Sequence, residues 1–149
     1  MAYHFKLETV LGLRRNLEEL AQQKLARELN LLEEQKLQLA ALRQQRQDLI
    51  VEFEDKKRRQ MSAPIFAFYV EGIFRKEQEV AAGRAMVEAQ QGAVARAREE
   101  LTAKVQDKKV MEKAKERDYQ KFLLAGLKKE QNEADEQMVL RFGRKGNLH

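Results

Sequence analysis

A seven-residue repeat of apolar side chains runs through the second half of this 149-residue chain. Residues seven apart lie on nearly the same face of an α-helix, because two helical turns take about 7.2 residues. A helix with such a face must pack it against another helix, and a coiled coil is the simplest fold that does so. The repeat consists of Phe66, Ile73, Val80, Val87, Val94 and Leu101.

The first half of the chain carries a matching apolar stripe, with steps mostly of three or four residues. Two polar side chains, Gln35 and Arg46, interrupt it. A polar residue in such a seam lowers stability but fixes the register, and Arg46 has the alternative of laying its aliphatic stem along the seam while its charge stays in water. Either residue also has the alternative of marking a surface for a partner. The apolar members are Leu17, Leu25, Leu29, Leu32, Leu39, Leu42, Leu49 and Phe53.

The only proline, Pro64, lies between the two halves. Proline is best tolerated in the first turn of a helix, and Ser62 is a suitable N-cap before it. We therefore expect one all-α domain, a long two-helix antiparallel coiled-coil hairpin. The predicted segments are a helix at about 5–58, a turn at about 59–63, a longer helix at about 64–141 and a frayed tail at 142–149. Folding about position 61 pairs residues whose numbers sum to roughly 123.

The composition supports this architecture and excludes several functions. Charged residues make up 36% of the chain, and the mean hydropathy of −0.70 suits helices that bury a single seam. The absence of cysteine excludes disulfides, thiol catalysis and cysteine-based zinc sites. No signal peptide or membrane span is recognisable, so we expect a soluble cytoplasmic protein whose contact with a membrane comes only through partners.

The sequence contains none of the common motifs that position catalytic residues. Neither a phosphate-binding GxxxxGK[ST] loop nor a GxGxxG motif occurs, and the two histidines, His4 and His149, lie near the ends of the chain. Adjacent acidic residues such as Glu33 and Glu34 point about 100° apart on a helix, so they do not converge on a metal ion. We expect no enzyme activity, no cofactor and no metal site.

Positive charge is concentrated in one segment of the predicted second helix. The chain has a net charge of +5, and residues 104–129 hold nine basic and four acidic side chains, which by themselves give five net positive charges. The apolar column is also broken there, by Lys108 and Lys115. We expect this segment not to pack along its own hairpin but to lie along, or insert into, an acidic surface, with plain exposure to solvent as the alternative. Tyr119, Phe122 and nearby leucines have the further alternative of covering the apolar N-terminal residues.

The two ends of the chain resemble those of the flagellar export protein FliJ family. The opening Phe5-Lys6-Leu7, Val10-Leu11-Gly12-Leu13-Arg14-Arg15 and Glu18-Glu19-Leu20-Ala21 is similar to that of the family, as is the stretch Glu130–Glu136 followed by Arg141-Phe142. The chain departs from the family at Asn132, where lysine is common, and in its fewer aromatic residues near the end of the first helix.

This resemblance implies a non-enzymatic component of the flagellar type III export apparatus, active in flagellum biogenesis and motility. Family members bind a hexameric export ATPase through the joined helix ends, contact the membrane export gate and handle export chaperones. The resemblance places ATPase binding on Phe5, Leu7, Val10, Leu11, Arg14, Lys108, Lys115, Tyr119, Phe122, Asp135 and Glu136. It places gate binding on Gln35, Leu39, Leu42 and Arg46.

Three alternatives remain open from the sequence. The equivalent stalk protein of a virulence type III secretion system shares the same plan. The basic charge is compatible with a coiled coil that binds nucleic acid, although the partners implied by the resemblance include none. The helices are also compatible with pairing between two chains rather than within one.

Overall fold

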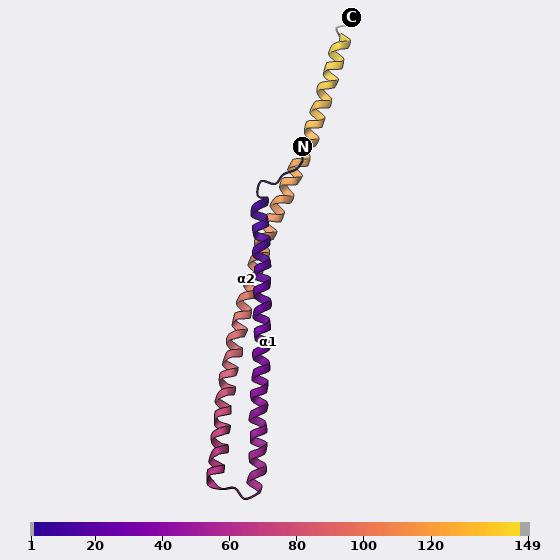
Figure 1. Cartoon of the computed structure of the whole chain (residues 1–149). Coiled ribbons are helices and arrows are strands. Elements are labelled where there is room, and N and C mark those ends of the chain that lie inside the picture. The colour runs from indigo at the N-terminus through magenta and orange to yellow at the C-terminus, as the bar shows by residue number, and fades with distance from the viewer. Residues whose placement is uncertain (1, 147–149) are drawn as a thin grey trace. The chain divides into compact units, whose positions relative to one another are not determined.

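The computed structural model describes residues 2–146, which form two α-helices and their connections: α1, Glu8–Arg58, and α2, Ala63–Gly146 (Figure 1). The fold predicted from the sequence, an antiparallel helical hairpin with the longer helix second, is confirmed. Each helix passes through two compact units. The hairpin unit comprises residues 19–103 and the terminal unit comprises residues 1–18 with 104–149.

Local hydrogen bonds set the helix boundaries. Helix α1 begins at Glu8, three residues later than predicted, where the Glu8 amide donates to the Phe5 carbonyl oxygen at 3.2 Å. Helix α2 begins at Ala63, and the Phe66 amide donates to the Ser62 carbonyl oxygen at 3.0 Å. Ser62 thus occupies the N-cap position, and Pro64 lies in the first turn, where its missing amide proton costs no helical hydrogen bond.

The prediction of a frayed tail from residue 142 is wrong for residues 142–146, which continue α2. Two glycines and several charges lower helix propensity there but remove no backbone donor, so the hydrogen-bonded ladder continues. The remaining part of that prediction, residues 147–149, lies outside the described residues.

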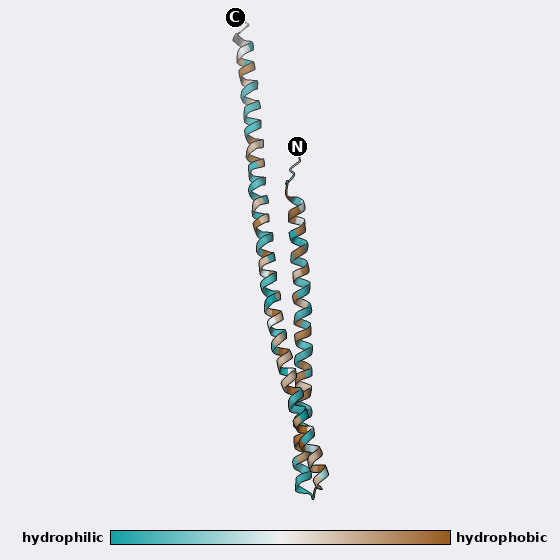
Figure 2. Ribbon diagram, turned by 90° about the vertical axis from the view of Figure 1, so that its left-hand side faces the viewer, coloured by the Kyte–Doolittle hydropathy of each residue, from teal (hydrophilic) through white to brown (hydrophobic). Residues whose placement is uncertain are grey.

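The hairpin unit is built on a narrow core along the seam between α1 and α2. Leu39, Val80 and Val87 form a buried cluster, against which Leu32 and Leu42 pack. Figure 2 shows the hydrophobic positions recurring between hydrophilic ones along both helices. The apolar stripes predicted for the two halves therefore do meet, as the heptad spacing requires.

The register of the hairpin unit agrees with the predicted pairing. Arg46 Nε lies 3.7 Å from Glu77 Oε1, and Lys24 Nζ lies 3.0 Å from Glu100 Oε2. The residue numbers of these pairs sum to 123 and 124. The two helices approach closely at Gly83, where an added Cβ would lie only 3.3 Å from Leu39 Cδ1.

The terminal unit has a small core of its own. Phe5, Leu11 and Met111 are buried together, and Tyr3, Val10 and Ala114 pack against them. Leu11 is fully buried, with 0% of its surface exposed. The segment before α1 is thereby fixed on α2.

The expectation that residues 104–129 do not pack along their own hairpin is wrong for the first part of this segment. Lys108 forms an ion pair with Glu18, and Lys115 Nζ lies 2.9 Å from Glu8 Oε2. The lysines that break the apolar column therefore face α1, where carboxylates neutralise them. These ion pairs continue the interface between α1 and α2, and the aliphatic stems of the two lysines lie along it.

Candidate interaction surfaces

An aromatic cluster lies at the N-terminal edge of the terminal unit. The Tyr3 ring centroid is 5.0 Å from that of Tyr119 and 5.2 Å from that of Phe122, the former in edge-to-face geometry. The Tyr3 hydroxyl donates to Asp118 Oδ2 at 3.0 Å and lies 3.3 Å from the carbonyl oxygen of Lys115. Partial burial, reinforced by the hydrogen bond to Asp118, raises the pKa of Tyr3 to about 12. Tyr119 and Phe122 therefore do pack against the N-terminal segment, through Tyr3.

The basic residues predicted to bind a partner in this unit are engaged within the chain. Arg14 Nη1 donates to the Asp107 carbonyl oxygen at 2.7 Å. The hydrogen bond from Lys115 lowers the pKa of the Glu8 carboxyl, and the hydrogen bond to Glu18 raises the pKa of Lys108. These contacts hold the N-terminal part of α1 against α2.

The apolar residues predicted for the same site divide into buried and exposed ones. Phe5 and Leu11 are core residues, and Val10 is half-buried against them. Leu7, by contrast, has 45% of its surface exposed. Phe5 and Leu11 are therefore core residues of the terminal unit, whereas Leu7 lies at its surface.

Beyond the aromatic cluster, α2 presents its side chains to solvent. All described side chains from Glu116 to Arg144 are exposed, including those of Asp135 and Glu136, which lie on the later part of the helix. Of the exposed apolar residues in this stretch, the sequence predicted only Tyr119 and Phe122 for a partner surface, and Leu123 and Leu127 had the alternative of covering the N-terminal residues. A periodic signal is present, because Leu124, Leu127, Ala134 and Met138 fall in steps of three, seven and four, in a different frame from Phe122.

The four residues predicted for the export gate lie along the seam of the hairpin unit. Leu39 is buried and Leu42 half-buried, so both are also core residues. Gln35 Oε1 and Arg46 Nε are buried without a hydrogen-bond partner among the described residues, although Arg46 pairs electrostatically with Glu77. Glu77 thus compensates the charge of Arg46, whereas the unsatisfied amide oxygen of Gln35 is costly in the seam.

The α2 side of this seam supplies residues that sequence reasoning did not name. A groove of about 270 Å³ is lined by Gln35, Leu39 and Leu42 of α1 and by Gly83 and Met86 of α2. Met86 is 54% exposed despite its apolar side chain. We call this the Met86 groove. Only the tertiary pairing of the helices brings these five residues together.

The family comparison decides the identity of the chain. A family model described as flagellar FliJ protein matches residues 3–147. The chain belongs to the FliJ family. It is accordingly a coiled-coil component of flagellar export, as its sequence resemblance predicted. Comparisons of this FliJ family member with curated proteins and with solved structures gave no match.

Two further properties of this FliJ family member bear on its site. None of the helices, as far as the structure describes them, has a stretch long and apolar enough to cross a membrane. Within residues 2–146, no group of three or more histidine, aspartate or glutamate side chains has a geometry that could hold a metal ion.

Proposed function

We propose that this FliJ family protein is a non-catalytic stalk component that binds and stimulates the hexameric export ATPase through its terminal unit. We further propose that it links this ATPase to the membrane export gate and escorts export chaperones, at the cytoplasmic face of the inner membrane. The observation that carries the proposal is the run of exposed apolar residues on α2 beyond a tightly fixed N-terminal segment.

The terminal unit offers a surface suited to a protein partner. The exposed fractions of Tyr119, Leu124 and Leu127 are 42%, 64% and 62%. Several exposed apolar side chains close together on one helix are typical of a protein interaction surface. Arg14, Lys108 and Lys115 support this surface from within, since each is bound to the facing helix. Asp135 and Glu136 add exposed acidic groups further along α2, suited to basic residues of the ring.

Stimulation of an ATPase requires no catalytic group in this chain. A helix that contacts one conformation of a ring subunit better than another shifts the populations by the difference in binding free energy. Exposed apolar side chains on one helix serve this purpose, because each contributes about 0.8 kcal/mol per methylene group buried against the partner.

The gate contact is assigned to the Met86 groove. Gln35 lines this groove, and its Oε1 lacks a hydrogen-bond partner in the described chain, so a partner that supplies one gains more than it would at an ordinary surface. Arg46 is not among the lining residues, and its Nε is paired with Glu77. Leu39 and Leu42 form the apolar floor beside Gln35.

The experiment measures ATP hydrolysis by the purified export ATPase with and without this protein. We expect stimulation and co-sedimentation, both reduced by Leu124→Ser combined with Leu127→Ser. The matched control is Leu31→Ser combined with Leu37→Ser, which changes two exposed leucines of the hairpin unit in the same way (41% and 64% exposed). Absence of stimulation and of co-sedimentation for the unaltered protein would refute the proposal.

A further inference from the structure

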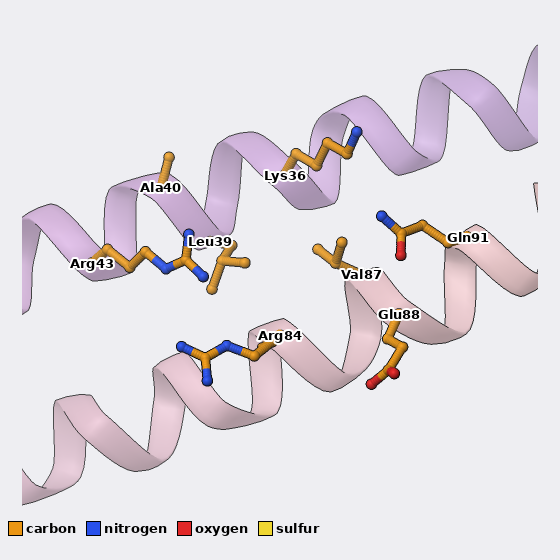
Figure 3. A pocket seen from close by; sticks show the side chains of 8 residues that line it. All are labelled: Lys36, Leu39, Ala40, Arg43, Arg84, Val87, Glu88 and Gln91. Atoms are coloured by element: carbon orange, nitrogen blue, oxygen red, sulfur yellow. The ribbon is translucent and has the colours of Figure 1, made fainter.

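A second groove runs along the other flank of Leu39 in the hairpin unit, opposite to the Met86 groove. It has a volume of about 530 Å³, and its floor is formed by Leu39 and Val87. Leu39 and Val87 are 6% and 9% exposed, so the floor is the edge of the buried seam itself. Figure 3 shows Leu39 and Val87 between the two helices, and the Ala40 side chain on the side of α1 turned away from α2. We call this the basic groove because of the residues on its rim.

Three cations line the rim: Lys36 and Arg43 on α1 and Arg84 on α2. Each is exposed, and none has an ion-pair or side-chain hydrogen-bond partner in the part of the chain that the structure describes. This distinguishes them from Arg46 and Lys76 in the same unit, which contact Glu77 and Glu79 respectively.

The charge along the basic groove is uneven. Figure 3 shows the guanidinium groups of Arg43 and Arg84 toward the same end, although they come from different helices. Toward the other end lie Lys36 and Glu88, the one acidic residue that lines the groove, with their side chains pointing away from each other. One end therefore holds two positive charges and the other end is nearly neutral.

We propose that the basic groove binds an acidic amphipathic helix of a partner protein. An apolar floor with charged rims is the arrangement that accepts one face of such a helix. Lys36 and Arg43 are seven residues apart, which places their positions about 10.5 Å apart along α1. A helix laid along the groove meets both with acidic residues seven positions apart and covers Leu39 and Val87 with the apolar residues between them.

The arrangement selects this occupant over other acidic molecules. A nucleic acid gains little from a narrow apolar floor and is repelled by Glu88, and a flat bilayer surface does not enter a groove between two helices. Complementary charges also fix the direction of the bound helix, because its more acidic end lies between Arg43 and Arg84. This inference concerns the flank opposite to the proposed gate surface and does not rest on the proposed function.

The first experiment measures binding of fluorescein-labelled helical peptides by anisotropy at physiological salt. The probe peptides carry two glutamates seven apart with leucines between them, in three sequence registers, and a matched set carries lysines instead. We expect the glutamate peptides alone to bind. Arg43→Glu combined with Arg84→Glu weakens their binding at least tenfold and gives binding of the lysine peptides.

The matched control is Arg27→Glu combined with Arg98→Glu, which alters the net charge equally at two exposed arginines of the same unit. Charges beyond about 8 Å are screened at this salt concentration, so we expect less than a twofold change. Equal weakening by both pairs, or no binding of any glutamate peptide at about 1 mM, overturns the proposal.

The second experiment uses the absence of cysteine from the chain to place a single thiol. Ala40→Cys puts it among the residues of α1 that line the groove, and Ala41→Cys puts it on the neighbouring face of α1. We expect the bound peptide to slow maleimide labelling at position 40 and not at position 41. Equal rates at both positions overturn the proposal.

Two other occupants are decided by the same variants. If no peptide binds, but the protein binds duplex DNA or phosphatidylglycerol vesicles and Arg43→Glu with Arg84→Glu abolishes that binding, the groove is a site for a polyanion. If the protein sediments as a dimer and the same substitutions make it a monomer, the groove binds a second copy of the chain. Either result overturns the proposal, whereas ATPase stimulation is measured separately and tests only the proposed function.

Discussion

Replacement of Leu11 by alanine tests whether the terminal unit depends on its small core. Leu11 is fully buried and packs with Phe5 and Met111. The substitution removes three carbon atoms, a loss of about 2.4 kcal/mol at about 0.8 kcal/mol for each buried methylene. The remaining cavity adds to this cost, but a core of three buried side chains collapses readily. We therefore expect a loss near the lower end of the range for such substitutions, about 3 kcal/mol.

The matched control is Leu13→Ala, which makes the same chemical change two residues further along α1. Leu13 is 57% exposed, so its truncation should cost less than about 1 kcal/mol. Both variants have similar helix propensity, because alanine and leucine are both good helix formers. The difference between them isolates burial.

Native-state hydrogen exchange of the first turns of α1 is the appropriate assay, because local opening of one unit need not follow global unfolding. A loss of about 3 kcal/mol accelerates exchange through local opening roughly 100-fold, since each 1.4 kcal/mol is a factor of ten. Leu11→Ala should also reduce ATPase stimulation, because it releases the N-terminal segment. Acceleration by the same factor in Leu11→Ala and Leu13→Ala would refute the reasoning.

Three further predictions follow from contacts and exposure. Gly126→Ala should stabilise the helix by about 1 kcal/mol and so slow amide exchange in the helical turn that contains it, because an added Cβ there meets no atom within 4 Å. Gly83→Val should lower the melting temperature, because an added Cβ there would lie 3.3 Å from Leu39 Cδ1. The pKa of Tyr3 is about 12 against an ordinary value of 10, so the contribution of its neutral hydroxyl to stability is complete below pH 10 and is lost as the pH rises through 12. The free energy of unfolding of the unaltered protein minus that of Tyr3→Phe should therefore fall between these pH values. A constant difference contradicts the assignment. Phe53→Ala, at a side chain 6% exposed, should cost about 3 kcal/mol or more in urea unfolding, against less than about 1 kcal/mol for Phe68→Ala, at one 69% exposed.

The heptad column illustrates how far the seam was predictable. Val80, Val87 and Val94 are buried as their spacing predicts. Phe66, at the start of the same column, is 47% exposed, because it lies in the first turn of α2, where the facing helix is about to end. Periodicity defines a face of a helix but not how far a partner covers it.

The candidate surfaces show the same division. Leu7, Tyr119 and Phe122 were predicted from the resemblance and are exposed, but exposed Leu124 and the residues Gly83, Arg84 and Met86 on the α2 side of the grooves were not predicted for any partner. A groove between helices is a property of two segments distant in the sequence. Its residues become neighbours only when the register is known.

The order of apolar residues and the single proline determined by themselves that this chain forms two long helices that pair antiparallel, because a 3.6-residue helix must bury a face that recurs every seven residues. The resemblance of its two ends predicted the family, which the family comparison over residues 3–147 confirmed. The tertiary structure decided which charges pair across the seam. In the sequence, Lys108 and Lys115 interrupt the apolar column. In the structure, Glu18 lies opposite Lys108 and Glu8 opposite Lys115, and these ion pairs hold both lysines in the interface between the helices. Whether a charged residue faces solvent or a counter-charge depends on what the other helix places beside it, and that is fixed only when the two helices are packed together.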